Sequence, residues 1–186
     1  LGDVYKRQLV TCSPLLHHSA VAQESSPQYG NPVPSDMVAI YDRGLSWLAS
    51  RQQKEGNWQG SGQSGVGVDA ICLMAFLASG EDPNYGKYAP NIRRALEYIL
   101  LQQDPKSGYF PSSMYHHGFS MLALSEAYGA VDESLLWEGK KRGPSMALAI
   151  ERAVRCAAAS QKKNTWGGWR YSPDDNSADT SVTGAV

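Results

Sequence analysis

The sequence predicts an all-α fold built from helix-pair repeats. Three helical segments with an apolar stripe each lead to a glutamine, a short polar turn and a glycine–aromatic step. The glutamines Gln52, Gln103 and Gln161 lie 51 and 58 residues apart, and a second apolar run follows each of the first two units. Such self-similarity is typical of stacked helical hairpins, because one pair alone cannot bury its apolar face.

The first unit is the clearest. Its helix is expected over residues 36–53, and Gly56 and Asn57 follow it with backbone preferences that end a helix before Trp58. The apolar stripe of this helix has 3.6-residue spacing and consists of Met37, Tyr41, Leu45 and Leu48.

The same signals place the other helices. They are expected at 67–79, 90–103, 114–128 and 144–161, with Pro144 at a first helical position, and a sixth begins at Asp179. The segment 70–78 is apolar on all sides, which favours a helix buried all round. Residues 130–143 are expected to form a longer connection with one helical turn near Leu135–Trp137.

These units resemble the QW repeats of squalene–hopene cyclases, whose wider relatives include protein prenyltransferase β subunits. The shared pattern is a basic residue, Gly or Ala, an aromatic–aliphatic pair, Gln, and Gly followed by an aromatic. The motif residues are Gln52 with Trp58, Gln103 with Phe110, and Gln161 with Trp169. The second copy ends in Phe110 instead of Trp, and the third has Cys156 at the aromatic position of its helix.

The resemblance covers roughly residues 36–186 and implies an α/α toroid, in which these motifs are structural. A closed ring in that family takes five to seven helix pairs. We therefore expect about three QW-type repeats here, forming an N-terminal fragment of an incomplete toroid that exposes apolar surface at its last pair.

Composition is ordinary for a globular protein. Of the 186 residues, 42% are hydrophobic and 19% are charged, and the net charge of −1 provides no basic field for nucleic acid. The longest apolar run, 70–78, is too short for a transmembrane segment.

The N-terminal region predicts an exported protein. Residues 1–8 resemble a translated sequencing adaptor, and residues 9–22 resemble the end of a signal peptide with a cleavage site at Ala20-Val21-Ala22. A leader without meaning is the alternative interpretation. Residues 23–35, rich in Ser, Pro, Gly and Asn, are expected to form a linker.

The cysteines say little about the compartment. Cys12 would leave with the signal peptide, whereas Cys72 and Cys156 fall in predicted helices with apolar neighbours, where a free thiol acts as a small hydrophobe. An oxidising compartment leaves a disulfide between these two open, although nothing in their spacing favours one.

Two aspartates are candidate catalytic acids. The cyclases that the chain resembles protonate an alkene from an Asp-x-Asp-Asp-Thr-Ala motif, and a buried carboxyl can stay protonated for that purpose. Here the matching stretch has Asn176, Ala178 at the position of the proton donor, and then Asp179. Asp69 stands at the equivalent point of the first pair. For both aspartates, helix N-capping is the favoured interpretation.

A zinc site is the weakest alternative. Asp69, Cys72 and His117 have the ligand types that prenyltransferases use for Zn²⁺, but the spacing is Asp-x-x-Cys instead of Asp-x-Cys. A structural or surface role is favoured for His116 and His117, so no metal and no cofactor is predicted.

Two functions follow as hypotheses. The first is a domain whose concave, aromatic-lined surface binds an apolar, isoprenoid-like ligand or a protein. The second is a terpene cyclase or prenyltransferase whose acid lies beyond residue 186. Whether the protein is an enzyme is left open by the broken acid motif.

Overall fold

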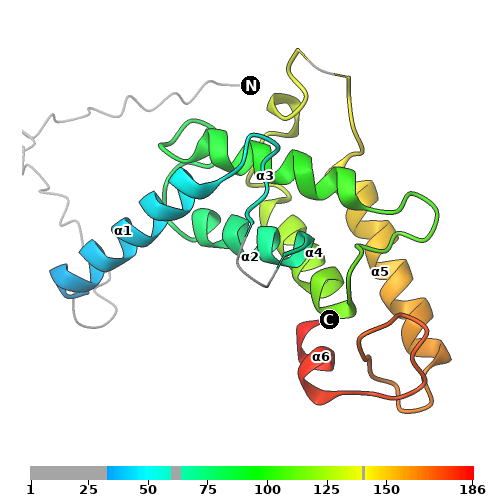
Figure 1. Ribbon diagram of the computed structural model, residues 1–186. Coiled ribbons are helices and arrows are strands. Elements are labelled where there is room, and N and C mark those ends of the chain that lie inside the picture. Colours follow the sequence, from blue (N-terminus) through cyan, green and yellow to red (C-terminus); the bar gives the residue numbers. More distant parts are fainter. Residues whose placement is uncertain (1–32, 60–63, 140) are drawn as a thin grey trace, which may run out of the picture. The chain divides into compact units, whose positions relative to one another are not determined.

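Helices form the fold in the part of the chain that the computed structural model describes, residues 33–59, 64–139 and 141–186. The helices are α1 (Ser35–Arg51), α2 (Val66–Leu77), α3 (Ala89–Gln102), α4 (Met114–Ala127), the 3₁₀ helix η1 (Glu133–Leu135), α5 (Met146–Lys163) and α6 (Thr180–Ala185) (Figure 1). No strand occurs in these ranges, so the all-α prediction is confirmed. The incomplete α/α toroid stays a prediction, and the adaptor and signal segments lie outside the described residues.

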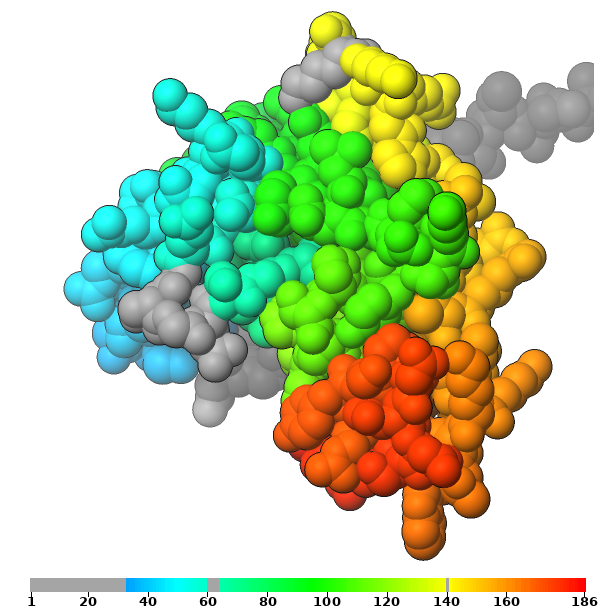
Figure 2. Space-filling model, turned by 45° about the vertical axis from the view of Figure 1, so that its right-hand side comes forward, coloured from blue at the N-terminus to red at the C-terminus, as the bar shows by residue number. Residues whose placement is uncertain are grey.

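In chain order the helices form three successive pairs, α1–α2, α3–α4 and α5–α6, and the packing between them runs mainly through the second helix of each pair. Helix α2 packs on α1, α3 and α4, and α4 packs in turn on α5 and α6. In the space-filling view the cyan first pair, the green second pair and the orange-to-red third pair follow one another across the surface (Figure 2). Helix α4 therefore links the packing of the first pair to that of the third.

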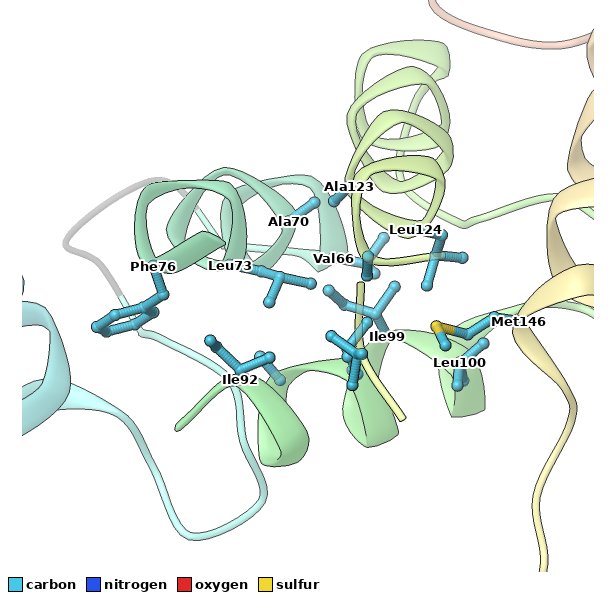
Figure 3. Packing of buried hydrophobic residues seen from close by; sticks show 14 of the residues in the cluster. Val66, Ala70, Leu73, Phe76, Ile92, Ile99, Leu100, Ala123, Leu124 and Met146 are labelled. Carbon is cyan, nitrogen blue, oxygen red and sulfur yellow. The ribbon is translucent and has the colours of Figure 1, made fainter. Parts of the chain in front are cut away.

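The core fills the space between α2, α3 and α4. Leu73 of α2 points toward Ile92 and Ile99 of α3 (Figure 3), and all three side chains are fully buried. Met146 of α5 and Leu100 of α3 extend this core to the third pair. Burying such side chains stabilises the fold by about 1.5–3 kcal/mol each.

The expected helix boundaries agree with the structure to within two residues. One residue was given the wrong position in its helix. Pro144 precedes α5 and is not its first residue, because Ser145 caps this helix: its Oγ accepts the N–H of Leu148 at 3.3 Å. The expected helical turn in the 130–143 connection is η1.

The described helices are too short or too polar to cross a bilayer. Cys72 and Cys156 are both free thiols and half-buried.

Candidate functional site

The three motif glutamines lie at the ends of α1, α3 and α5, the first helix of each pair, and hold their own turns in place; we call these three the outer helices. The Nε2 groups of Gln52, Gln103 and Gln161 donate to the carbonyls of Gly56, Gly108 and Gly167 at 3.0, 3.0 and 2.8 Å. The number of residues between glutamine and glycine is three after Gln52, four after Gln103 and five after Gln161. The side chain is long enough to absorb these differences in turn length.

The first two glutamines also bind the next outer helix. Gln52 Nε2 donates to the Asn91 carbonyl at 2.9 Å, and Gln103 Nε2 donates to the Ala149 carbonyl at 2.8 Å. Both acceptors belong to the first turn of the following helix. Each of these amides therefore joins three segments: its own helix, its turn and the neighbouring pair.

The motif aromatics pack inside the repeats. Trp58 and Phe110 are buried, and Trp169 is half-buried. The indole Nε1 of Trp58 donates to the Leu48 carbonyl at 2.8 Å, and that of Trp169 donates to the Ala157 carbonyl at 3.0 Å. Each acceptor stands four residues before the motif glutamine, so the ring closes back onto its own outer helix.

One position of the second helix of each pair, here called the inner helix, has a shared function that the sequence alone did not reveal. The fourth residue of α2, α4 and α6 accepts the backbone N–H of the motif aromatic. Asp69 Oδ1 accepts Trp58 N at 2.7 Å, His117 Nδ1 accepts Phe110 N at 3.2 Å, and Thr183 Oγ1 accepts Trp169 N at 3.1 Å. The fifth residue of each inner helix is small, namely Ala70, Gly118 or Gly184.

Asp69 is therefore not an N-cap, which corrects the sequence interpretation. Gly65 is the residue before α2, and Asp69 lies inside the first turn, 1% exposed. Burial raises the pKa of Asp69 from 3.8 to about 6, and the hydrogen bond from Trp58 opposes that rise. Burial, together with the charge of the same carboxylate, raises the pKa of the Cys72 thiol to about 11.

Asp179 does cap a helix, as the sequence indicated. Its Oδ1 accepts the N–H groups of Ser181 and Val182 at 2.8 and 3.2 Å. The hydroxyl of Ser181, followed by these backbone bonds, lowers the pKa of Asp179. A carboxyl held ionised in this way is the opposite of the proton donor that alkene protonation requires.

The two adjacent histidines have different surroundings. His117 is fully buried, and its Nε2 lies 3.1 Å from the Ala153 carbonyl, which leaves Nδ1 to accept from Phe110. Burial lowers the pKa of His117, and the contact to Ala153 opposes that change. In the described part of the chain, no three His, Cys, Asp or Glu side chains gather into a metal-binding group, so Asp69, Cys72 and His117 form no zinc site there.

An aromatic hollow of about 320 Å³ lies where α2 and α4 begin. Its side chains come from α2, α4 and the loop before α6: Gly67, Val68, Ile71, Ser113, Tyr115, His116, Phe119 and Tyr171. Tyr115 stacks on Phe119 with ring centres 6.3 Å apart, and it meets Tyr171 at 6.1 Å. We call this group of residues the aromatic hollow.

Backbone contacts hold the hollow in shape. The Met114 N–H donates to the Tyr171 carbonyl at 2.9 Å, which fixes the loop against the start of α4. A Cβ at Gly67 would lie 2.7 Å from the Cα of His116, so only glycine permits this approach of α2 to α4. Ser113 Oγ and His116 Nδ1 are hydrogen-bonded at 2.9 Å.

The apolar surface continues from the hollow along both inner helices. Ile71 of α2 and Leu122 of α4 are 47% and 46% exposed. A second hollow, about 460 Å³, lies at the opposite ends of these helices, and Met74, Leu77 and Leu122 contribute to its lining. The inner face of α2 and α4 is thus apolar along its length, although Glu126 adds a charge at the far end.

Neither candidate acid belongs to the aromatic hollow. The eight lining residues include no carboxylate. Asp179 reaches the hollow only indirectly, because Tyr115 donates to the Ser181 hydroxyl and Ser181 donates to Asp179. Asp69 points instead to the turn that carries Trp58.

The hydrogen bonds from Gln52 and Gln103 to the next helix pair form what we call the junctions between repeats. The fold and these junctions define a protein of helix-pair repeats, each built on the same Gln–Gly–aromatic turn. Comparison with known protein families, with curated proteins and with solved structures found no match.

Proposed function

We propose that the chain binds an elongated, uncharged apolar ligand, isoprenoid-like in character, in the aromatic hollow and along the inner face of α2 and α4. The observation that carries the proposal is the hollow itself, in which three aromatic rings and two aliphatic side chains surround about 320 Å³. Ligand pockets of proteins are typically apolar, with a few polar groups, and begin at about 300 Å³.

The polar groups of the hollow favour an alcohol or another neutral head group. Ser113, His116 and Tyr115 can donate or accept hydrogen bonds, and no lysine or arginine is among the lining residues. A diphosphate would need cationic or backbone N–H partners, so the free alcohol is the better probe.

The test is titration of the protein with farnesol by calorimetry. Ile71→Asp places a charge on the inner face at a half-exposed position, where the fold tolerates it, and should weaken binding at least about tenfold. The matched control is Leu101→Asp on α3, since Leu101 is 61% exposed and outside the hollow; its affinity should match that of the unchanged protein. Equal affinities of both variants, or no binding by the unchanged protein, would reject the proposal.

The surroundings of the two candidate acids, Asp69 and Asp179, favour ligand binding without catalysis. Cyclisation requires a protonated acid facing the substrate, whereas the pKa of Asp179 is lowered and Asp69 is outside the hollow. We therefore expect no cyclic product when the protein is incubated with squalene and analysed by gas chromatography. A cyclic triterpene that is lost in Asp69→Asn or Asp179→Asn would favour the cyclase alternative.

Export is also proposed, on the sequence of residues 9–22 alone. Expression behind a complete leader in a Gram-negative host should yield a periplasmic product beginning at Gln23, as determined by mass spectrometry. Uncleaved protein in the cytoplasm would contradict this location.

A further inference from the structure

A chain of hydrogen bonds leads from the cap of α6 to the aromatic hollow. Asp179 Oδ1 accepts the hydroxyl of Ser181, and Ser181 Oγ accepts the hydroxyl of Tyr115. Tyr115 lines the hollow, whereas the other two residues are not among its lining side chains. The chain therefore connects a charged group outside the hollow to a ring that a ligand in the hollow would contact.

The charge of Asp179 fixes the direction of these bonds. Its Oδ1 also accepts the N–H groups of Ser181 and Val182 at 2.8 and 3.2 Å. The Ser181 hydroxyl, followed by these N–H groups, lowers the pKa of the carboxyl. An ionised carboxylate accepts hydrogen bonds and cannot donate them. Ser181 must therefore use its one hydroxyl hydrogen for Asp179.

Tyr115 consequently has no hydrogen left for a ligand. Because the Ser181 hydroxyl donates to Asp179, its oxygen is the acceptor in the bond with Tyr115. A phenol has a single hydrogen, and that hydrogen is used here, but its oxygen can still accept. Tyr115 can therefore accept a hydrogen bond from a ligand in the hollow and cannot donate one to it.

Packing holds both ends of the Tyr115 side chain. A Cβ at Gly118 would lie 2.0 Å from the Ala185 carbonyl oxygen, so α6 rests directly on α4, the helix that carries Tyr115. The ring of Tyr115 contacts the rings of Phe119 and Tyr171. Its ring is thus restrained by two aromatic neighbours, and its hydroxyl by the bond to α6.

The other polar groups of the hollow can serve donors and acceptors alike. Ser113 Oγ and His116 Nδ1 share one hydrogen bond. If the serine donates, the imidazole keeps a donor at Nε2 and the serine oxygen can accept; in the other tautomer, the serine keeps its hydrogen and Nε2 can accept. The pair therefore accommodates either kind of head group, and the discrimination falls to Tyr115.

We propose that Tyr115 makes the aromatic hollow selective for ligands whose head group is a hydroxyl, over an aldehyde or ether of the same chain. The alcohol donates its hydrogen to the Tyr115 oxygen, whereas a carbonyl or ether oxygen beside it would find no hydrogen to accept. Tyr115 is then the specificity-determining residue, and Ser181 and Asp179 are positioning residues that act through it. The inference rests on the proposed function, because it concerns the head group of the same ligand.

The test compares calorimetric titrations with farnesol and farnesal, which share a carbon chain and differ in whether the head group can donate. The unchanged protein should bind farnesol about five to ten times more tightly, the factor that one net hydrogen bond contributes to an affinity. Ser181→Ala frees the Tyr115 hydrogen, so farnesal should bind more tightly and the preference should disappear. Tyr115→Phe should also remove the preference, but by weakening farnesol.

Two further variants separate this role from a structural one. Ser181→Thr keeps a hydroxyl between Tyr115 and Asp179 and should keep the preference for farnesol. Ser177→Ala is the matched control, since the Ser177 hydroxyl accepts from Arg170 at 3.1 Å in the loop before α6 and has no part in the chain. Loss of the preference in Ser177→Ala, or its persistence in both Ser181→Ala and Tyr115→Phe, would overturn the inference.

The same titrations distinguish failure of this inference from failure of the proposed function. Equal affinities of the unchanged protein for farnesol and farnesal would reject the selectivity, while ligand binding in the hollow would stand. Binding of neither compound would reject the proposed function and the selectivity together.

Discussion

The side-chain amide of Gln103 donates to the main-chain carbonyl of Ala149, which lies 46 residues further along the chain, at 2.8 Å. Gln103 is buried and also holds the Gly108 carbonyl of its own turn. One side chain therefore satisfies two carbonyls that belong to two successive helix pairs, and this relationship gives the first prediction.

Replacing Gln103 with Ala should lower the free energy of unfolding by about 2–4 kcal/mol, because two carbonyls lose their partner and each costs about 1–3 kcal/mol when buried unsatisfied. Urea unfolding monitored by circular dichroism provides the measurement. Gln161→Ala removes a single bond at an exposed site, so its loss should be under about 1 kcal/mol. Equal losses for both variants would contradict the role of Gln103 at the junction.

Substitutions at two turn glycines distinguish the cost of backbone strain from the cost of a clash with the next helix pair. Gly108 and Gly167 both have positive φ, at 76° and 68°, so an Ala at either site costs a similar strain of about 1 kcal/mol. At Gly108 the new Cβ would also lie 2.4 Å from the Arg152 carbonyl. Gly108→Ala should therefore lower the melting temperature of dilute protein by more than Gly167→Ala does, and equal shifts would be the contrary result.

Truncation of Trp58 should be costly. The ring is 5% exposed, contacts Phe76 and binds the Leu48 carbonyl, and such truncations cost about 3–5 kcal/mol. Trp166→Ala provides the control, since Trp166 is 77% exposed. Thermal unfolding should show a large decrease in melting temperature for Trp58→Ala and almost none for Trp166→Ala. Unchanged stability in Trp58→Ala would remove its structural role.

Asp69 should make the fold less stable as the pH rises. Its pKa is raised from 3.8 to about 6 in the folded protein, so the native state holds the proton more tightly than the unfolded chain. The stability from this group is complete below the unfolded pKa and is lost as the pH rises through the folded one. Asp69→Asn, which keeps an acceptor for Trp58, should therefore gain about 2–3 kcal/mol relative to the unchanged protein between about pH 4 and about pH 7.5.

Asp104→Asn is the control for this effect. The backbone N–H of Ser107 lowers the pKa of Asp104, so that group stabilises the fold above the unfolded pKa and the variant should change in the opposite direction. Urea midpoints across the pH range test both variants. If Asp69→Asn and the unchanged protein show parallel curves, the pKa of Asp69 is not raised.

The repeat could be predicted from the sequence because its signals are periodic or local. Apolar spacing placed the helices, and the motif residues Gln103, Gly108 and Phe110 occupy the turn expected of them. Pro144 was misplaced because proline is equally compatible with the loop before an N-cap, and the preference of Ser145 for that cap decided the start of α5.

The shared position of the inner helices could not be predicted. Its three occupants, Asp69, His117 and Thr183, have different chemistry and follow their aromatic residues at unequal distances of 11, 7 and 14 residues. Only the three-dimensional arrangement shows that each accepts the same backbone N–H. The sequence predicted an aromatic-lined surface but not this hollow. The position of Tyr171 depends on the path of the loop before α6, which the sequence does not specify.

The chemistry at this fourth position gives neighbouring repeats opposite responses to acid. A proton on Asp69 still leaves an oxygen that can accept from Trp58, and uptake of that proton is favoured by burial. A second proton on His117 would occupy Nδ1, the atom that accepts from Phe110, and burial disfavours that form. Mild acid should therefore open the molecule between its second and third pairs while the first turn stays closed. Amide hydrogen exchange at Phe110 would accelerate before that at Trp58. A chain of structurally similar repeats would then open at a site determined by one side chain.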